Sequence, residues 1–316
     1  METPPRRRFG LVLSLVAACL LLSACGRWRD AQAAQSAAGT ASHTLDGGRV
    51  VHVFAPDFTE PTSPALVIGL HGGMGNGLQF RENSGFDAVA AEHGFVVAYP
   101  DGTSIWGERD QRTWNAGACC GRGADAERAV DDVGFVSDVI DLAVAEYGVD
   151  PARVYVAGHS NGAMMAYRLA CELSDRIAGV AVVAGSLEVG DCAPTHAVRV
   201  LHLHGLADAN VRIDGGAGGG ISDHVFHSPR LSVAELAHLN GCHGSDAHRD
   251  TTNPDVTVTL WAGCDVGADV ALVTIDGAEH PWMGRSITRL QRRFAGQPYM
   301  DLDATTFIWD WFEADG

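Results

Sequence analysis

The sequence predicts an α/β fold, with a mostly parallel central sheet and helices on both faces. Strand-like runs recur along the chain, and most are nearly continuous in Val, Ile and Leu. Such runs are typical of strands that are buried on both faces, as in a parallel sheet. Helix-forming stretches separate these runs, and this alternation implies right-handed crossover connections.

The expected strands follow one another as short apolar runs. In order they are RVVHVF at 49–54, ALVIGLHGG at 65–73, GFVVAYPDG at 94–102, RVYVAGHS at 153–160, IAGVAVVAG at 177–185, VRVLHLHG at 198–205 and DVALVTIDGAEH at 269–280. The helical patterns between and after them lie at 85–93, 132–147, 162–173 and 232–240, with a final amphipathic helix within 303–316. The segment 103–131 has no clean periodicity and is too long for a plain connection, which indicates a functional insertion near a site. The Gly-rich segment 214–223 is predicted to be a mobile loop.

The N-terminus has the features of an export signal. PPRRRFG is basic, and LVLSLVAACLLLSAC is apolar but too short to span a membrane. Leu22-Ser23-Ala24-Cys25 resembles a bacterial lipobox, which predicts a lipoprotein signal peptide at 1–24 and a lipid on Cys25. The alternative is an ordinary signal peptidase site around 31–34. We expect a flexible tether at 25–44, one folded domain at 45–316, and a membrane-anchored protein on the extracellular or periplasmic face.

The charge restricts the partners. The formal net charge is −17, and all 22 basic residues are Arg. Nucleic-acid phosphates would repel such a chain, so we expect no nucleic-acid partner. Composition does not determine the oligomeric state.

The cysteines predict disulfides. Of eight Cys, Cys19 lies in the leader and Cys25 is the expected lipidation site, which leaves six. An even number in an exported chain favours disulfides. The expected pairs, in order of preference, are Cys242 with Cys264, which flank a hairpin region, and Cys171 with Cys192. Cys119 and Cys120 are then left to each other or to thiols.

Three polar residues follow predicted strands in an order that is typical of hydrolases. Ligands of parallel sheets bind beyond the carboxyl ends of the strands. Ser160, Asp208 and His280 each lie just past a different run, in that chain order. Ser160 is also the centre of GHSNG, between a strand and a helix. Gly at both flanking positions of such a sharp turn avoids clashes of Cβ atoms.

This pattern can activate a serine. A hydroxyl becomes a useful nucleophile when a base such as His280 takes its proton, and an Asp on the other ring nitrogen fixes the His tautomer. Glu279 is an alternative acid. Adjacent side chains on an extended segment point apart, however, which favours Asp208. The alternative for Ser160 is a purely structural βα turn.

Other residues can complete such a site. The amide of Asn161, at a helix N-terminus, and the amide of Gly73 or Met74 in HGGMG are candidate donors to an oxyanion. Candidates for an apolar wall, which could equally be core, are Trp106, Trp114 and Trp282.

The histidines do not form a metal motif. His202 and His204 share one face of a predicted strand, but a buried strand makes a poor open metal site. No H-E-x-x-H or Cys/His spacing supports zinc. We therefore expect neither a metal nor another cofactor.

The chain resembles the polyhydroxybutyrate depolymerase family of α/β-hydrolases. The resemblance rests on LHGGMGNG, VAYPDGT, WNAGACCG, VDDVGF, RVYVAGHSNGAMMAYRLACELSDRIAGVAVVAG, HLHGLADANVRIDGG, NGC with a later GC, and DGAEHPWMG, spread over about 49–312. Bacterial feruloyl and acetylxylan esterases and an actinobacterial lipoprotein are similar. The resemblance implies an α/β-hydrolase fold with Ser160 as nucleophile, Asp208 as acid and His280 as base. One departure is the stretch 278–284, AEHPWMG, where the family usually has GGHTWPG.

The resemblance implies a serine esterase that acts through an acyl-enzyme. The expected substrates are polyhydroxyalkanoate polyesters or their oligomers, and the alternative is feruloyl or acetyl esters of plant polysaccharide. Two other classes remain open, a serine peptidase and a non-catalytic surface-binding lipoprotein. The second is disfavoured because no member of the Ser-Asp-His set is missing.

Overall fold

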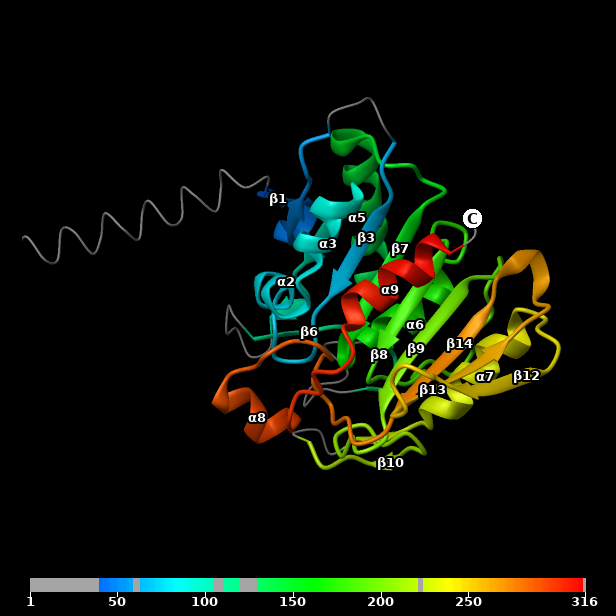
Figure 1. Cartoon of the computed structure of the whole chain (residues 1–316). Coiled ribbons are helices and arrows are strands. Elements are labelled where there is room, and N and C mark those ends of the chain that lie inside the picture. The colour runs from blue at the N-terminus through cyan, green and yellow to red at the C-terminus, as the bar shows by residue number, and fades with distance from the viewer. Residues whose placement is uncertain (1–39, 59–62, 105–110, 120–129, 221–223, 315–316) are drawn as a thin grey trace, which may run out of the picture. The chain divides into compact units, whose positions relative to one another are not determined.

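The computed structural model in Figure 1 describes the chain except for residues 1–39, 59–62, 105–110, 120–129, 221–223 and 315–316. One compact unit comprises Ser42–Gly316 and contains the central sheet except for the first two residues of its first strand. Among the described residues, ten strands form this sheet. In spatial order they are β1 (Thr40–Thr44), β2 (Val50–Phe54), β4 (Val96–Pro100), β3 (Leu66–Leu70), β7 (Val154–His159), β8 (Gly179–Val183), β9 (Arg199–Gly205), β14 (Val270–Ile275), β13 (Val256–Trp261) and β12 (Ser245–Arg249).

The middle of the sheet is parallel, as predicted. Strands β4, β3, β7, β8, β9 and β14 pair in parallel with their neighbours. Antiparallel pairs occur towards the edges, between β2 and β4 and between β14, β13 and β12. The parallel strands therefore end at one common edge, where β3 points downwards in Figure 1.

Helices cover both faces of the sheet. The helices that contribute to the two core clusters are α2 (Gly77–Ser84), α3 (Phe86–His93), α5 (Asp132–Tyr147), α6 (Asn161–Glu172), α7 (Pro229–Leu239) and α9 (Ala304–Glu313). The short helix α8 (Arg289–Ala295) has no buried residue. In β3, Leu66, Ile68 and Leu70 pack in a cluster with α5, α6 and α7, whereas Val67 packs in a second cluster with α2, α3 and α9. This alternation explains why the strand is apolar on both faces.

The predicted elements are present with small shifts at their ends. The helix predicted at 132–147 matches α5, which begins after Asp131, whose side chain accepts a hydrogen bond from the amide of Gly134. The predicted tether at 25–44 is wrong at its end, because residues 40–44 form β1. Polar side chains gave no strand pattern there, but pairing at a sheet edge uses only backbone groups. Helices α2 and α8 were not predicted.

The long insertion and the Gly-rich loop contain short ribbons. Within 103–131, β5 (Thr103–Ser104) pairs with β6 (Arg112–Thr113). Within the Gly-rich segment 214–223, β10 (Gly216–Ala217) pairs with β11 (Val225–Phe226), which follows the segment. The short 3-10 helices lie at Asp46–Gly48 and Asp265–Gly267.

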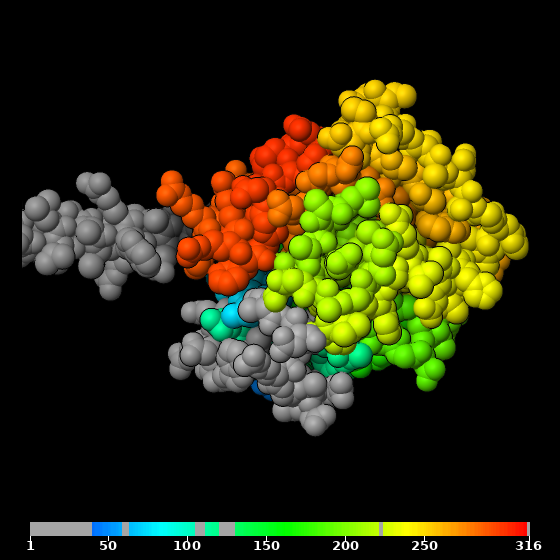
Figure 2. All heavy atoms as spheres, turned by 90° about the horizontal axis from the view of Figure 1, so that it is seen from below, coloured from blue at the N-terminus to red at the C-terminus, as the bar shows by residue number. Residues whose placement is uncertain are grey.

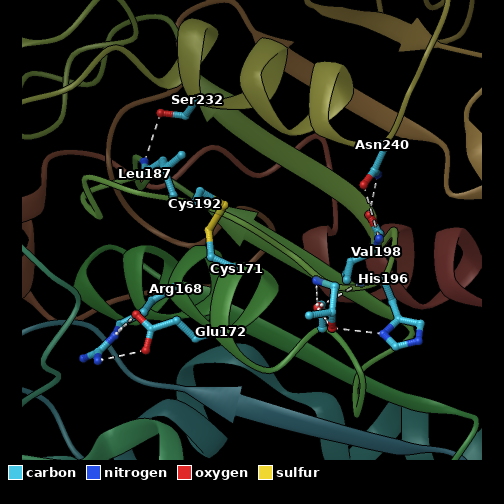
Figure 3. Close-up of a disulfide and its surroundings, with 11 residues drawn as sticks. Arg168, Cys171, Glu172, Leu187, Cys192, His196, Val198, Ser232 and Asn240 are labelled. Atoms are coloured by element: carbon cyan, nitrogen blue, oxygen red, sulfur yellow. Dashed lines mark hydrogen bonds and ion pairs between the residues drawn. A yellow bond between two sulfur atoms is a disulfide. The ribbon is translucent and has the colours of Figure 1, made fainter.

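Both predicted disulfides are present. Cys242 and Cys264 are bonded across the β12–β13 hairpin, and Cys171 on α6 is bonded to Cys192 in the loop after β8. Figure 3 shows the second bond reaching from α6 to this loop. Cys119 is also disulfide-bonded. Cys120, the partner that the sequence suggested for it, lies outside the described residues. The expected lipidation site Cys25 lies outside them too.

Candidate active site

Ser160 sits on a sharp turn between β7 and α6. Its backbone has φ 54° and ψ −120°, in the left-handed half of conformational space that is costly for a residue with a side chain. The amide of Ser160 donates to the carbonyl of Val183 at 2.9 Å, which ties the turn to β8. A Cβ on Gly158 would lie 2.2 Å from the carbonyl oxygen of Gly162, and one on Gly162 would lie 2.3 Å from that of Leu70. Both motif glycines are therefore required by close backbone packing.

The loops after β9 and β14 bring an acid and an imidazole to Ser160. Nε2 of His280 lies 3.0 Å from Oγ of Ser160, and Nδ1 of His280 lies 2.7 Å from Oδ2 of Asp208. Both His280 and Asp208 are buried. Figure 2 views this edge from below, where the yellow-green segment that follows Asp208 lies beside the orange segment that follows His280. The sequence-predicted set is thus assembled in space.

Asp208 is held in its ionised form. Its Oδ1 accepts hydrogen bonds from the amides of Asn210 at 2.8 Å and Val211 at 3.0 Å. Burial alone would raise the pKa of this carboxyl, but the charge of His280 and the hydrogen bonds from His280 and Val211 outweigh it and lower the pKa. An ionised carboxylate only accepts, so Nδ1 of His280 carries a proton. In the neutral imidazole, the lone pair of Nε2 then faces the Ser160 hydroxyl.

The alternative acid Glu279 points elsewhere. A Cβ on Gly296 would meet the Glu279 carboxylate, so this side chain lies against the segment after α8. The ring nitrogens of His280 contact Asp208 and Ser160 instead. The geometry therefore agrees with the choice of Asp208 over Glu279.

The candidate oxyanion donors differ in whether their amides already donate a hydrogen bond within the protein. Gly73 packs on Asn161, since a Cβ on Gly73 would lie 3.7 Å from Cβ of Asn161. Within the described part of the chain, the amides of Gly73 and Asn161 have no hydrogen-bond acceptor. The prediction for Met74 is wrong, because its amide donates to the carbonyl of Arg112 at 2.8 Å. This leaves Gly73 and Asn161 as the pair beside Ser160.

The side chain of Asn161 has a separate role that the sequence did not reveal. Its Oδ1 accepts from the amide of Trp114 at 2.7 Å, and its Nδ2 donates to the carbonyl of the same residue at 3.1 Å. Two residues earlier, Arg112 pairs through its backbone with Gly75 and Met74. The segment that Asn161 holds therefore supports the loop that contains Gly73. A pairing across so many residues leaves no local sequence signal.

The tryptophan predictions are not supported where they can be examined. Trp114 is fully buried in the core and donates from Nε1 to the carbonyl of His71 at 2.9 Å. Trp282 is 3% exposed, donates from Nε1 to Oγ1 of Thr305, and packs edge-on against Phe80. Both are core residues and not pocket walls, because their rings have almost no surface left for a ligand. Trp106 lies outside the described residues.

Two neighbouring histidines are structural. His71 donates from Nδ1 to the carbonyl of Gly72 and accepts at Nε2 from the amide of Gly102, and burial lowers its pKa to about 4. His159 donates from Nε2 to the carbonyl of His280 at 2.8 Å. Burial, followed by the charge of His280, lowers the pKa of His159 to about 4. Both rings are thus neutral at neutral pH and stabilise the backbone beside Ser160 and His280.

A buried carboxylate in the loop after β8 was also missed. Glu188 is buried, accepts from the hydroxyl of Ser186 at 2.6 Å, and contacts Nε2 of His224 at 2.8 Å. It attaches the segment that contains β11 to the rest of the fold. Among the described residues, no group of three or more His, Cys, Asp or Glu side chains is arranged to bind a metal ion.

Comparison with known proteins assigns the chain to a family. Residues 52–218, which include Ser160 and Asp208, match the family described as esterase PHB depolymerase. The chain belongs to this esterase family. Membership supports hydrolysis of carboxylic esters as the reaction class.

The relatives of the chain have several names. It is 31% identical over 239 residues to feruloyl esterase B of Piromyces equi, covering 73% of this chain and 42% of the relative. It is 30% identical over 157 residues to a poly(3-hydroxybutyrate) depolymerase of Ralstonia pickettii, covering 46% of this chain and 31% of the relative. The chain thus spans less than half the length of either relative.

A solved structure supports the fold. The acetyl xylan esterase from Aspergillus awamori superposes with a TM-score of 0.59 at 14% identity, covering 77% of this chain and 94% of that chain. At such low identity the likeness concerns the fold alone. It agrees with the predicted α/β-hydrolase fold.

Proposed function

We propose that this protein hydrolyses carboxylic esters by a serine mechanism, with Ser160 as nucleophile, His280 as general base and Asp208 as its orienting acid. The observation that supports this most directly is the hydrogen-bonded series from Asp208 through His280 to Oγ of Ser160, at 2.7 and 3.0 Å. The alternative of a simple βα turn does not explain this convergence of three loops. It also leaves the positive φ of Ser160 without a reason.

The proposed reaction has two halves. Oγ of Ser160 attacks the ester carbonyl while its proton passes to Nε2 of His280. The amides of Gly73 and Asn161 stabilise the negative charge that develops on the carbonyl oxygen. The intermediate collapses, the alcohol leaves with the proton from His280, and the acyl group stays on Ser160. Water then gives its proton to His280, attacks the acyl-enzyme and releases the acid, and the proton returns to Ser160.

Removal of the proposed catalytic groups tests the mechanism. Ser160→Ala alone should lower kcat nearly as much as Ser160→Ala combined with His280→Ala, because the two act as one unit. Asp208→Asn should lower kcat by about 10⁴-fold, as in serine proteases, because it favours the wrong tautomer of His280. Glu279→Gln is the matched control and should be mild. Ester turnover by Ser160→Ala would contradict the proposal.

A phosphonate and two substrate panels separate the reaction classes. A serine-directed phosphonate should label Ser160 in the native protein. p-Nitrophenyl esters of increasing acyl length, assayed beside peptide anilides, distinguish an esterase from a peptidase. Activity on neither panel, together with no labelling, would favour a non-catalytic binding protein.

The proposed substrates are polyhydroxyalkanoate polyesters or their oligomers, with feruloyl or acetyl esters of polysaccharide as the second candidate. The family description and the depolymerase relative support the first. The feruloyl esterase relative supports the second, since its match extends over more of this chain. Product analysis on polyhydroxybutyrate, methyl ferulate and acetylated xylan in parallel decides between them. The substrate that gives the highest kcat/KM identifies the class.

Export and anchoring are part of the proposal. The support is the lipobox-like Leu22–Cys25 after an apolar leader. In the described part of the chain, no helix is both long and apolar enough to cross a membrane. Cys25→Ser should move the protein from the membrane fraction to the soluble fraction, because lipid chains on Cys25 would provide the anchor. Unchanged membrane association would contradict the anchor.

A further inference from the structure

We infer that Tyr167, His202 and His204 form a buried positioning chain that fixes the loop of Asp208, an inference that rests on the proposed function. The hydroxyl of Tyr167 lies 2.7 Å from Nδ1 of His202, and Nε2 of His202 lies 2.9 Å from Nδ1 of His204. Nε2 of His204 lies 2.8 Å from the carbonyl oxygen of Val211. All three side chains have no exposed surface. The series therefore joins α6, which begins after Ser160, to the loop that contains Asp208.

The direction of every hydrogen bond in this chain is determined by its last acceptor. A carbonyl oxygen only accepts, so Nε2 of His204 carries a proton. Burial lowers the pKa of both His202 and His204, which keeps both rings neutral. Nδ1 of His204 must then accept from His202, and Nδ1 of His202 must accept from Tyr167. Burial also raises the pKa of Tyr167, so that its hydroxyl remains a donor.

The chain acts on the backbone that holds the catalytic acid. Val211 receives the hydrogen bond of His204 at its carbonyl, while its amide donates to Oδ1 of Asp208 at 3.0 Å. The carboxylate and the imidazole thus hold the same residue from two sides. The polarised Nε2–H of His204 also lies 3.7 Å from Oδ2 of Asp208, the oxygen that faces His280. This distance is too long for a hydrogen bond, but the N–H dipole favours the negative charge.

Packing alone does not account for the arrangement. Three apolar side chains would fill the same space without the cost of burying polar groups. Every donor and acceptor in this series has a partner only when each hydrogen bond runs from Tyr167 towards the Val211 carbonyl. The hydrogen bonds of His204 reach His202 and the Val211 carbonyl, whereas Asp208, His280 and Arg230 act on it only through their charge. His204 therefore positions the loop of Asp208 and makes no hydrogen bond to a catalytic side chain.

Substitution of His204 tests the positioning role. His204→Leu removes the donor and leaves the Val211 carbonyl buried without a partner. We expect kcat to fall by about 10-fold to 10²-fold, through displacement of Asp208, with little change in KM. His204→Gln, whose side-chain nitrogen reaches the position of Nε2, should recover most of kcat. Loss of kcat to the same degree in both variants, or normal kcat in His204→Leu, would overturn the inference.

A second variant covers the case in which His204→Leu does not fold. Tyr167→Phe removes one hydroxyl with little change of shape and should lower kcat by roughly threefold to tenfold, because the donor series loses its first member. Tyr155→Phe is the matched control, since Tyr155 stacks on Phe312 in the other core cluster. It should leave kcat unchanged. Equal kcat in the two variants would count against the inference.

Nuclear magnetic resonance tests the chain without any activity. Long-range proton–nitrogen spectra of the Ser160→Ala protein should show His202 and His204 both protonated at Nε2 only, over the neutral pH range. Protonation of His204 at Nδ1 would refute the stated direction. An inactive wild-type protein with these tautomers would contradict the proposed function but not the hydrogen-bonded chain. An active enzyme with the other tautomers would contradict the hydrogen-bonded chain but not the proposed function.

Discussion

The second glycine of the serine turn is a sharp test of the geometry. In Gly162→Ala the new Cβ would lie 2.3 Å from the carbonyl oxygen of Leu70 and 2.5 Å from that of His71. Normal contacts between carbon and oxygen are about 3.3 Å or longer, so the backbones must separate by about 1 Å. Residues 70 and 71 lead directly into Gly73, which moves with them. The separation would therefore grow between Ser160 and its proposed oxyanion donor.

The expected effect is mainly on the reaction. A misplacement of about 1 Å costs roughly 10²-fold in rate, which corresponds to about 2.7 kcal/mol in the barrier. Overpacking typically destabilises the fold by about 1 to 3 kcal/mol, which most domains can tolerate. Gly162→Ala should thus fold but turn over p-nitrophenyl esters about 10²-fold more slowly. The rate of phosphonate labelling at Ser160 should fall in parallel.

The control separates geometry from the general effect of an added methyl group. Gly190→Ala places its Cβ where no atom lies within 4 Å. It should keep wild-type kcat and thermal stability. If Gly162→Ala retains kcat to within about threefold while remaining folded, the assignment of Gly73 as an oxyanion donor is refuted.

Three further predictions follow from the described contacts. Replacing both Cys242 and Cys264 with Ser should lower the free energy of unfolding by about 3 kcal/mol, because the bond closes a loop of 22 residues; an unchanged urea midpoint would contradict this. His71, with its pKa lowered to about 4 by burial, stays neutral in the native state while the unfolded chain binds a proton below about 6.5, so stability should fall as pH drops from 6.5 towards 4. The loss from His71 is about 2 kcal/mol at pH 5, and His71→Asn should be less sensitive to acid in urea titrations over this range. Trp282→Phe should destabilise the fold by about 1 to 2 kcal/mol through its lost hydrogen bond to Thr305, without altering the preference among acyl lengths; an altered preference would return Trp282 to the pocket.

The sequence predicted most strands of the sheet because burial on both faces leaves a local signal. Leu66–Leu70 contains no polar side chain and Val270–Ile275 contains only one, Thr274, and each strand has a helix layer on either side. The proposed site was predictable for a related reason. In a parallel sheet the ends of strands converge, so residues that follow β7, β9 and β14 meet at one edge whatever their separation in the chain.

Features that depend on long-range contacts had no such signal. The tryptophans illustrate this. Trp114 and Trp282 are of a residue type that often lines pockets, but both are buried in the core. The burial of Trp282 depends on residues far away in the sequence, such as Phe80. Likewise, the sequence placed Met74 beside Gly73 as an equal candidate donor. Only the pairing with Arg112, in another segment, removes the Met74 amide from consideration.

The side chains that surround the proposed triad act mostly on backbone groups. Asn161 holds both peptide groups of Trp114, His204 holds the carbonyl of Val211, and His159 holds the carbonyl of His280. His280 is itself a group of the proposed reaction, Val211 lies in the same loop as Asp208, and the segment of Trp114 pairs through Arg112 with the loop of Gly73. A backbone hydrogen bond constrains the loop itself, and the polar partners are buried, where losing one leaves an unsatisfied group. Substitutions at these three positions should therefore change the turnover of bound ester more than its affinity, because they displace the reacting groups.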